Sequence, residues 1–124
     1  MKRDIENRED IELMVDEFYE KIKTDPVIGF IFNDIAKVNY NKLLLTMYDF
    51  WENTIFFTGG YDGNPMKIHK QLNQLITLKK EHFSQWDRLF SENVDALFEG
   101  KNASLAKQRA ANISAVMQIK IIQE

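Results

Sequence analysis

The sequence contains no cysteine, and only two histidines and two prolines occur among its 124 residues. Without cysteine there are no disulfides, thiolate zinc sites, iron–sulfur clusters or cysteine nucleophiles. Two histidines are too few for a three-histidine zinc site or for the paired Glu-x-x-His motifs of a di-iron bundle, and no H-E-x-x-H motif occurs. The chain also lacks a phosphate-binding glycine loop and a G-x-S-x-G motif, so nothing supports a nucleotide-binding or hydrolase function.

Neither sign of charge dominates the sequence, because 16 basic residues are scattered among 19 acidic ones and the net charge is -3. A nucleic-acid partner is not expected, since such proteins concentrate positive charge on one face. No apolar run is long enough to span a membrane, and the start of the chain is charged, so the expected location is the cytoplasm with no membrane partner. The length predicts a single domain over residues 1–124.

Apolar residues recur at three- and four-residue spacing in four segments, at 9–23, 39–57, 81–99 and about 102–121. This spacing is typical of amphipathic helices and predicts an all-α fold. Asn7 is placed to cap the first helix, and Asp25-Pro26 should end it. Gly100 is predicted as the C-terminal cap of the third helix, and Asn102 as the N-cap of the last.

The segments between these helices are less regular. Residues 27–32 are nearly all apolar and resemble a buried strand, but no partner strand exists, so a short helical turn or tight corner is predicted. Residues 58–65 hold three of the five glycines and form a loop. A brief helical piece is expected at 66–72, and the boundaries within 73–81 stay open.

His69 lies in the short segment after this loop, with Met66 three residues before it on the same helical face. That neighbour would place the imidazole beside an apolar wall, where it would suit a haem ligand. The local pattern by itself favours the simpler interpretation, a half-exposed histidine on a polar turn between two lysines. The local sequence therefore does not establish a haem-ligand role for His69, and the local patterns of Phe32 and Trp86 favour an ordinary core.

An ordered set of motifs runs through nearly the whole chain. It comprises FYEKI at 18–22, Asp25 with Gly29 and IFN at 31–33, FW at 50–51, YDGNP at 61–65, His69, HFxxWxxLF at 82–90, and Arg109-Ala110 with Ile113 and Met117. The set resembles the group III truncated haemoglobins, a short two-over-two variant of the globin fold. The resemblance implies a truncated globin-like helical sandwich that encloses a haem pocket.

The resemblance also implies one haem b whose iron is ligated by His69 on the proximal side. The opposite axial position would bind dioxygen, nitric oxide or a similar small ligand. Tyr19 and Trp86 would direct hydrogen-bond donors into this distal pocket and stabilise a ligand with partial negative charge. Phe32 would stack on the porphyrin at the corner.

At the distal position where some family members have histidine, this chain has Leu43, followed one turn later by Met47. Both are apolar, so the polar contacts are left to Tyr19 and Trp86, and Leu43 would act as a steric gate. This departure disfavours mechanisms that use a distal histidine as an acid–base group, such as peroxide cleavage. The residues expected to contact the haem are Phe32, Tyr61, Met66, Phe83, Phe90, Ile113 and Met117.

The resemblance leaves several roles open. His82 would begin a helix and have a structural role, with a haem propionate within its reach, and Tyr61, Lys42 and Lys67 are further propionate candidates. Residues 71–80 would form an extra turn. The implied activity is ligand binding with nitric oxide dioxygenase-like or peroxidase-like redox chemistry, supported by a reductase, in preference to oxygen transport. The alternative is a haem-free helical interaction or regulatory module of globin-like shape.

Overall fold

The structure is a computed structural model that describes residues 2–35, 39–56 and 79–118. The helical elements are α1 (Arg8–Thr24), the π-helical turn η1 (Ile31–Ile35), α2 (Tyr40–Phe56), α4 (Lys80–Leu97) and α5 (Lys101–Met117). No strand occurs within the described ranges, which confirms the all-α prediction. The apolar segment after α1 forms a helical corner, as predicted, and no strand.

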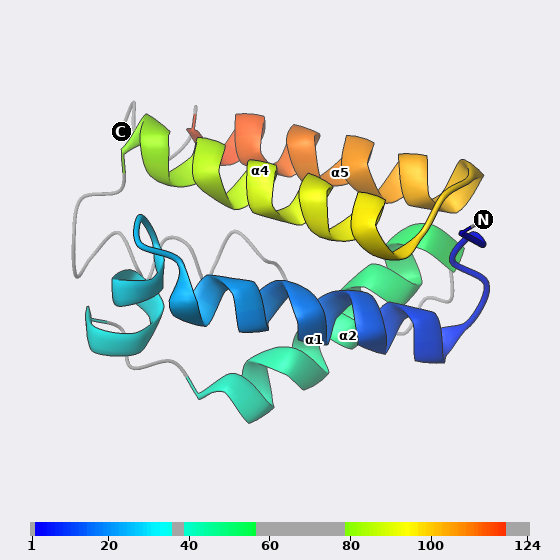
Figure 1. Cartoon of the computed structure of the whole chain (residues 1–124), viewed down its shortest axis with the longest axis horizontal. Coiled ribbons are helices and arrows are strands. Elements are labelled where there is room, and N and C mark those ends of the chain that lie inside the picture. The colour runs from blue at the N-terminus through cyan, green and yellow to red at the C-terminus, as the bar shows by residue number, and fades with distance from the viewer. Residues whose placement is uncertain (1, 36–38, 57–78, 119–124) are drawn as a thin grey trace.

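The helices form two layers of two. In Figure 1, α4 and α5 lie side by side in one layer, and α1 and α2 form the layer beneath them. Contacts join α1 to both α2 and α4, and α5 to both α2 and α4, so each helix packs against a partner in its own layer and one in the other. The core between the layers consists of the inward stripes of all four helices and the buried residues of the corner.

The ends of α1 are set by local side-chain hydrogen bonds, as predicted. Asn7 caps the helix, because its Oδ1 atom accepts a hydrogen bond from the N–H of Asp10 at 3.0 Å. Asp25 ends it, and its Oδ2 atom accepts hydrogen bonds from the N–H groups of Val27 and Ile28, each at 2.9 Å. The corner is therefore ordered by the carboxylate that precedes it.

The boundary between α4 and α5 differs from the prediction. Helix α4 ends at Leu97, and Gly100 is the N-cap of α5 instead of the C-terminal cap of α4, with its carbonyl accepting from the N–H of Ser104 at 2.9 Å. Asn102 lies inside the first turn of α5 and is not its N-cap. The predicted roles of Gly100 and Asn102 as caps were therefore wrong.

The cap of α5 comes from the other end of the chain. The carboxylate of Asp4 accepts hydrogen bonds from the N–H groups of Asn102 at 2.9 Å and Ala103 at 2.8 Å. Ile5 is fully buried, and its carbonyl accepts a hydrogen bond from the Asn102 side chain at 2.8 Å. A carboxylate is favourable at this position because two helix N–H groups and the positive end of the helix dipole face it.

A second polar link joins the two layers. Asn93 of α4 is fully buried, and its Nδ2 atom donates to the carbonyl of Met14 at 2.8 Å. Lys21 donates from Nζ to Asn93 Oδ1 at 2.8 Å. Because a buried amide without partners is costly, these bonds fix how α1 lies against α4.

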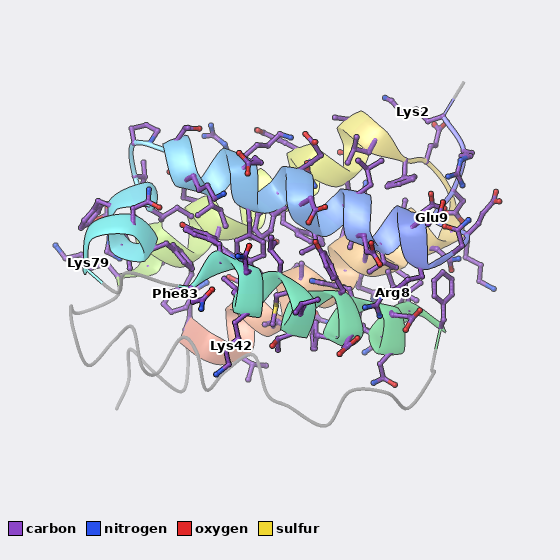
Figure 2. All side chains as sticks on the ribbon, turned by 90° about the horizontal axis from the view of Figure 1, so that it is seen from below. Lys2, Arg8, Glu9, Lys42, Lys79 and Phe83 are labelled. Carbon is purple, nitrogen blue, oxygen red and sulfur yellow. The ribbon has the colours of Figure 1, made fainter. Side chains whose placement is uncertain are left out.

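A surface link joins α1 to α2. In Figure 2, Arg8 reaches from the start of α1 toward α2. Its Nη1 atom lies 2.9 Å from Asp49 Oδ1 and 3.1 Å from Glu52 Oε1. Because exposed ion pairs contribute little to stability, we attribute the packing of α1 against α2 to the apolar contacts between the two helices.

Low pH should weaken the attachment of the N-terminal residues to the helices. This attachment consists of the hydrogen bonds of Asp4 to the start of α5 and those of Arg3 and Glu6 to Asp10 of α1. Burial alone would raise the pKa of Asp4 and that of Asp10, but hydrogen bonds to their carboxylates outweigh it and lower both pKa values. For Asp10 the donors include Arg3 and the N–H of Glu6. A lowered pKa in the folded state stabilises the fold above the unfolded pKa, and this stabilisation is lost as the pH falls through the folded value.

We therefore expect the urea midpoint to fall as the pH drops below about 4. In Asp10→Asn the dependence should be shallower, because one of the two carboxylates no longer titrates. Glu17→Gln, on an exposed face of α1, is the control and should keep the parent's dependence. Identical slopes for the parent and Asp10→Asn would contradict this account of the attachment.

Candidate functional site

The candidate site is built around a group of aromatic rings from α1, the corner and α4. The Phe18 ring lies edge-on to three others, with centroid distances of 5.0 Å to Tyr19, 5.7 Å to Trp86 and 5.1 Å to Phe90. Tyr19 in turn lies edge-on to Phe32 at 6.5 Å. Four residues predicted for the pocket, Tyr19, Phe32, Trp86 and Phe90, therefore belong to one connected group.

Tyr19 contributes a phenol hydroxyl to this group of aromatic rings. Its side chain is only 6% exposed, and its hydroxyl makes no hydrogen bond with any residue in the described part of the chain. Burial raises the pKa of Tyr19 far above its ordinary value, and the nearby Tyr40 raises it further. Tyr19 is therefore a neutral phenol at physiological pH, with a proton available to a partner that the described chain does not supply.

Trp86 is held by rings on two sides. Its ring is nearly parallel to that of Phe90, with 14° between the planes and a centroid distance of 6.0 Å. Phe90 also stacks against Trp51 of α2, with a centroid distance of 4.7 Å and 17° between the planes. The indole nitrogen of Trp86 is buried. This packing restricts the rotation of the indole, so the direction of its N–H is defined by the core.

The remaining described residues of the predicted pocket are apolar. Leu43 and Met47 lie one turn apart on α2 and are 6% and 5% exposed. Phe83 is also buried, and Ile113 of α5 is partly buried against the same core. A wall of this kind excludes water and strengthens any hydrogen bond formed inside it.

Several predicted residues lie outside the described part of the chain. These are His69, Tyr61, Met66 and Lys67, together with the side chain of Met117 and most of segment 71–80. Lys42 is described, and it is exposed and projects outward from α2 in Figure 2.

His82 lies at the start of α4, as predicted. Its Nδ1 atom accepts a hydrogen bond from the N–H of Lys79 at 3.0 Å, which satisfies a donor at the beginning of the helix. The described residues contain no group of three or more histidine, aspartate or glutamate side chains that could hold a metal ion by themselves.

Three residues near the site were not predicted from the sequence. Phe18 joins the aromatic group from the same buried stripe as Tyr19, a signal that the periodicity of α1 already contained. Ser114 of α5 is buried and donates from Oγ to the carbonyl of Phe83 at 3.3 Å. Asp87 follows Trp86, and burial raises its pKa; its Oδ1 atom is buried with no hydrogen-bond partner among the described residues. No pattern in the sequence marked Ser114 or Asp87.

Within the described ranges, no helix is both long and apolar enough to cross a membrane.

Comparison with known proteins agrees with this fold. No family model matches the chain. The chain is 28% identical over 121 residues to the group 3 truncated hemoglobin ctb of Campylobacter jejuni, covering 95% of this chain and 93% of that protein. The crystal structure of the group III truncated hemoglobin from Campylobacter jejuni superposes with a TM-score of 0.82, at 28% identity and over 98% of this chain and 95% of that one. Sequence and fold together therefore support a group III truncated haemoglobin.

Proposed function

We propose that this protein binds one haem b among its helices, with His69 as the proximal ligand of the iron, and holds dioxygen or a related diatomic ligand on the opposite side. Membership of a globin family supports a haem cofactor and a small ligand. When bound, the haem would supply an iron centre that coordinates the ligand. The chain's own residues would set how tightly the ligand is held.

The phenol of Tyr19, whose side chain is 6% exposed and makes no hydrogen bond to the described residues, is the observation that carries this proposal. A tyrosine hydroxyl in a protein interior usually has a hydrogen-bond partner, and the described chain offers none to Tyr19. A ligand with partial negative charge would satisfy it. Tyr19 is well suited to this task because burial keeps its phenol protonated.

The apolar residues of the site favour binding over acid–base chemistry. Leu43 and Met47 are buried and cannot donate or accept a proton. We therefore infer that a ligand is stabilised by Tyr19 and Trp86 and is released slowly. Slow release suits redox chemistry, such as the conversion of nitric oxide by held dioxygen, with a reductase as partner, better than it suits oxygen transport. Peroxide cleavage that relies on a distal histidine is disfavoured.

The visible spectrum of the purified protein tests the assignment of the cofactor and its ligand. With added hemin we expect a Soret band that is lost or shifted in His69→Ala, because the iron loses its proximal imidazole. His82→Ala is the matched control, since His82 bonds the start of α4, and it should keep the parent's band. A parent protein that shows no Soret band with hemin would indicate instead a haem-free helical module.

A further inference from the structure

Three residues close a ring of contacts where α1, the corner and α2 meet. The hydroxyl of Tyr40 donates to Asn33 Oδ1 at 2.8 Å, and Asn33 Nδ2 donates to the carbonyl of Lys23 at 2.7 Å. The Lys23 ammonium completes the ring, because its Nζ atom lies 4.7 Å from the centroid of the Tyr40 ring. We call Lys23, Asn33 and Tyr40 the α2 clasp.

The clasp is not needed to begin α2. Asn39 already serves the first turn, because its Oδ1 atom accepts from the N–H of Lys42 at 3.3 Å and its carbonyl accepts from the N–H of Leu43 at 3.0 Å. The bonds of Tyr40 and Asn33 instead run to other elements. They hold the start of α2 to the end of α1, which is a tertiary role.

The clasp adjoins the residues assigned to the distal side. Tyr40 packs against the core, and it is close enough to Tyr19 to contribute to the raised pKa of that phenol. Asn33 directly follows Phe32, and Leu43 lies three residues after Tyr40, on the same face of α2. A movement of the first turn of α2 would therefore displace Leu43 relative to Tyr19.

We propose that the α2 clasp limits the rate at which a diatomic ligand enters and leaves the distal side, by holding the first turn of α2 and Leu43 against α1. This inference rests on the proposed function. The contacts involved are exposed side-chain hydrogen bonds and one cation–aromatic contact, which are individually weak. Such a clasp opens often enough to let a small ligand through, and its strength sets how often.

Laser photolysis of the carbon monoxide complex of the ferrous protein tests the proposal. In Tyr40→Phe, which keeps the ring but loses the bond to Asn33, bimolecular carbon monoxide association should become about fivefold faster. Dissociation should accelerate by the same factor, because a barrier outside the binding position affects entry and exit equally. The equilibrium affinity should therefore stay unchanged. Asn33→Ala should reproduce this result, since it removes the same bond.

Tyr48→Phe is the matched control. Tyr48 also lies on α2, and its hydroxyl donates to Asp16 of α1, so the substitution removes an equivalent interhelical bond in the middle of the helix. We expect this variant to keep the parent's association rate. An equal acceleration in Tyr48→Phe would overturn the proposal, because general loosening of α2 would then explain both variants.

Amide hydrogen exchange in the first turn of α2 gives a readout that needs no haem. Exchange at residues 43–45 should be faster in Tyr40→Phe than in the parent and unchanged in Tyr48→Phe. Unchanged association rates in haem-bearing Tyr40→Phe and Asn33→Ala would overturn the clasp and leave the proposed function standing. A parent protein that retains no haem would overturn the proposed function, and this inference with it.

Discussion

Replacement of Tyr19 by phenylalanine is expected to speed the release of dioxygen by about 10- to 100-fold. A hydrogen bond to a charged or partly charged group contributes about 1.5–3 kcal/mol, and every 1.4 kcal/mol corresponds to a factor of ten. Phenylalanine keeps the edge-on contacts of the ring with Phe18 and Phe32, so the loss is confined to the hydroxyl. The release rate is measured by stopped-flow mixing of the oxygenated protein with a scavenger of dioxygen.

Trp86→Phe should show an increase in the same direction, because it removes the second donor. The control is Tyr48→Phe, which removes a phenol that already donates to Asp16. Measurements of ligand release and of ligand association distinguish the role of Tyr19 from that of Tyr40 in the α2 clasp. Tyr19→Phe should change release far more than association, whereas the α2 clasp acts on both. If neither Tyr19→Phe nor Trp86→Phe speeds release, the assignment of the distal donors is wrong.

Substitution of Gly100 by alanine is expected to destabilise the fold by about 3 kcal/mol. Gly100 has φ 142° and ψ -168°, a conformation that is essentially restricted to glycine and costs other residues about 1–3 kcal/mol. The new methyl group would also lie 2.6 Å from Cγ of Asp4, so the carboxylate that caps α5 would have to move. Loss of a helix cap costs about 1 kcal/mol more.

Thermal unfolding measures this effect, and the melting temperature should fall by roughly 10 °C or more. Lys101→Ala is the neighbouring control, and it should stay within about 0.5 kcal/mol of the parent because Lys101 is exposed. A double variant with Asp4→Ala should lose less than the sum of the two single variants, since both act on the same cap. Full additivity, or a negligible effect of Gly100→Ala, would contradict the described attachment of the N-terminal segment.

The candidate site divides into a part that sequence patterns indicated and a part that they did not. Motif order indicated Tyr19, Phe32 and Trp86 through the family resemblance, while their local patterns favoured an ordinary core. Their ring contacts through Phe18 join residues far apart in the chain. The α2 clasp had no sequence signal at all, because its bonds depend on where the corner places Asn33.

The boundary between α4 and α5 shows why some local predictions fail. A glycine two residues before an asparagine is compatible with the end of one helix and with the start of the next, and both assignments satisfy the same apolar stripes. The choice was made by Asp4, whose carboxylate bonds the first turn of α5 from the opposite end of the chain. Nothing in the charged sequence around Asp4 predicted that Ile5 would be fully buried.

The sequence by itself determined the helices, the capping of α1 by Asn7 and the helical corner after Asp25, because these features depend on periodicity and on hydrogen bonds within a few residues. Only the tertiary structure decided the partners of Asp4 and Asn93, the cluster of rings around Phe18, and the hydroxyl of Tyr19 that no described residue satisfies. Each of these depends on which side chains two helices bring together, and the spacing of residues along a single chain segment carries no information about that.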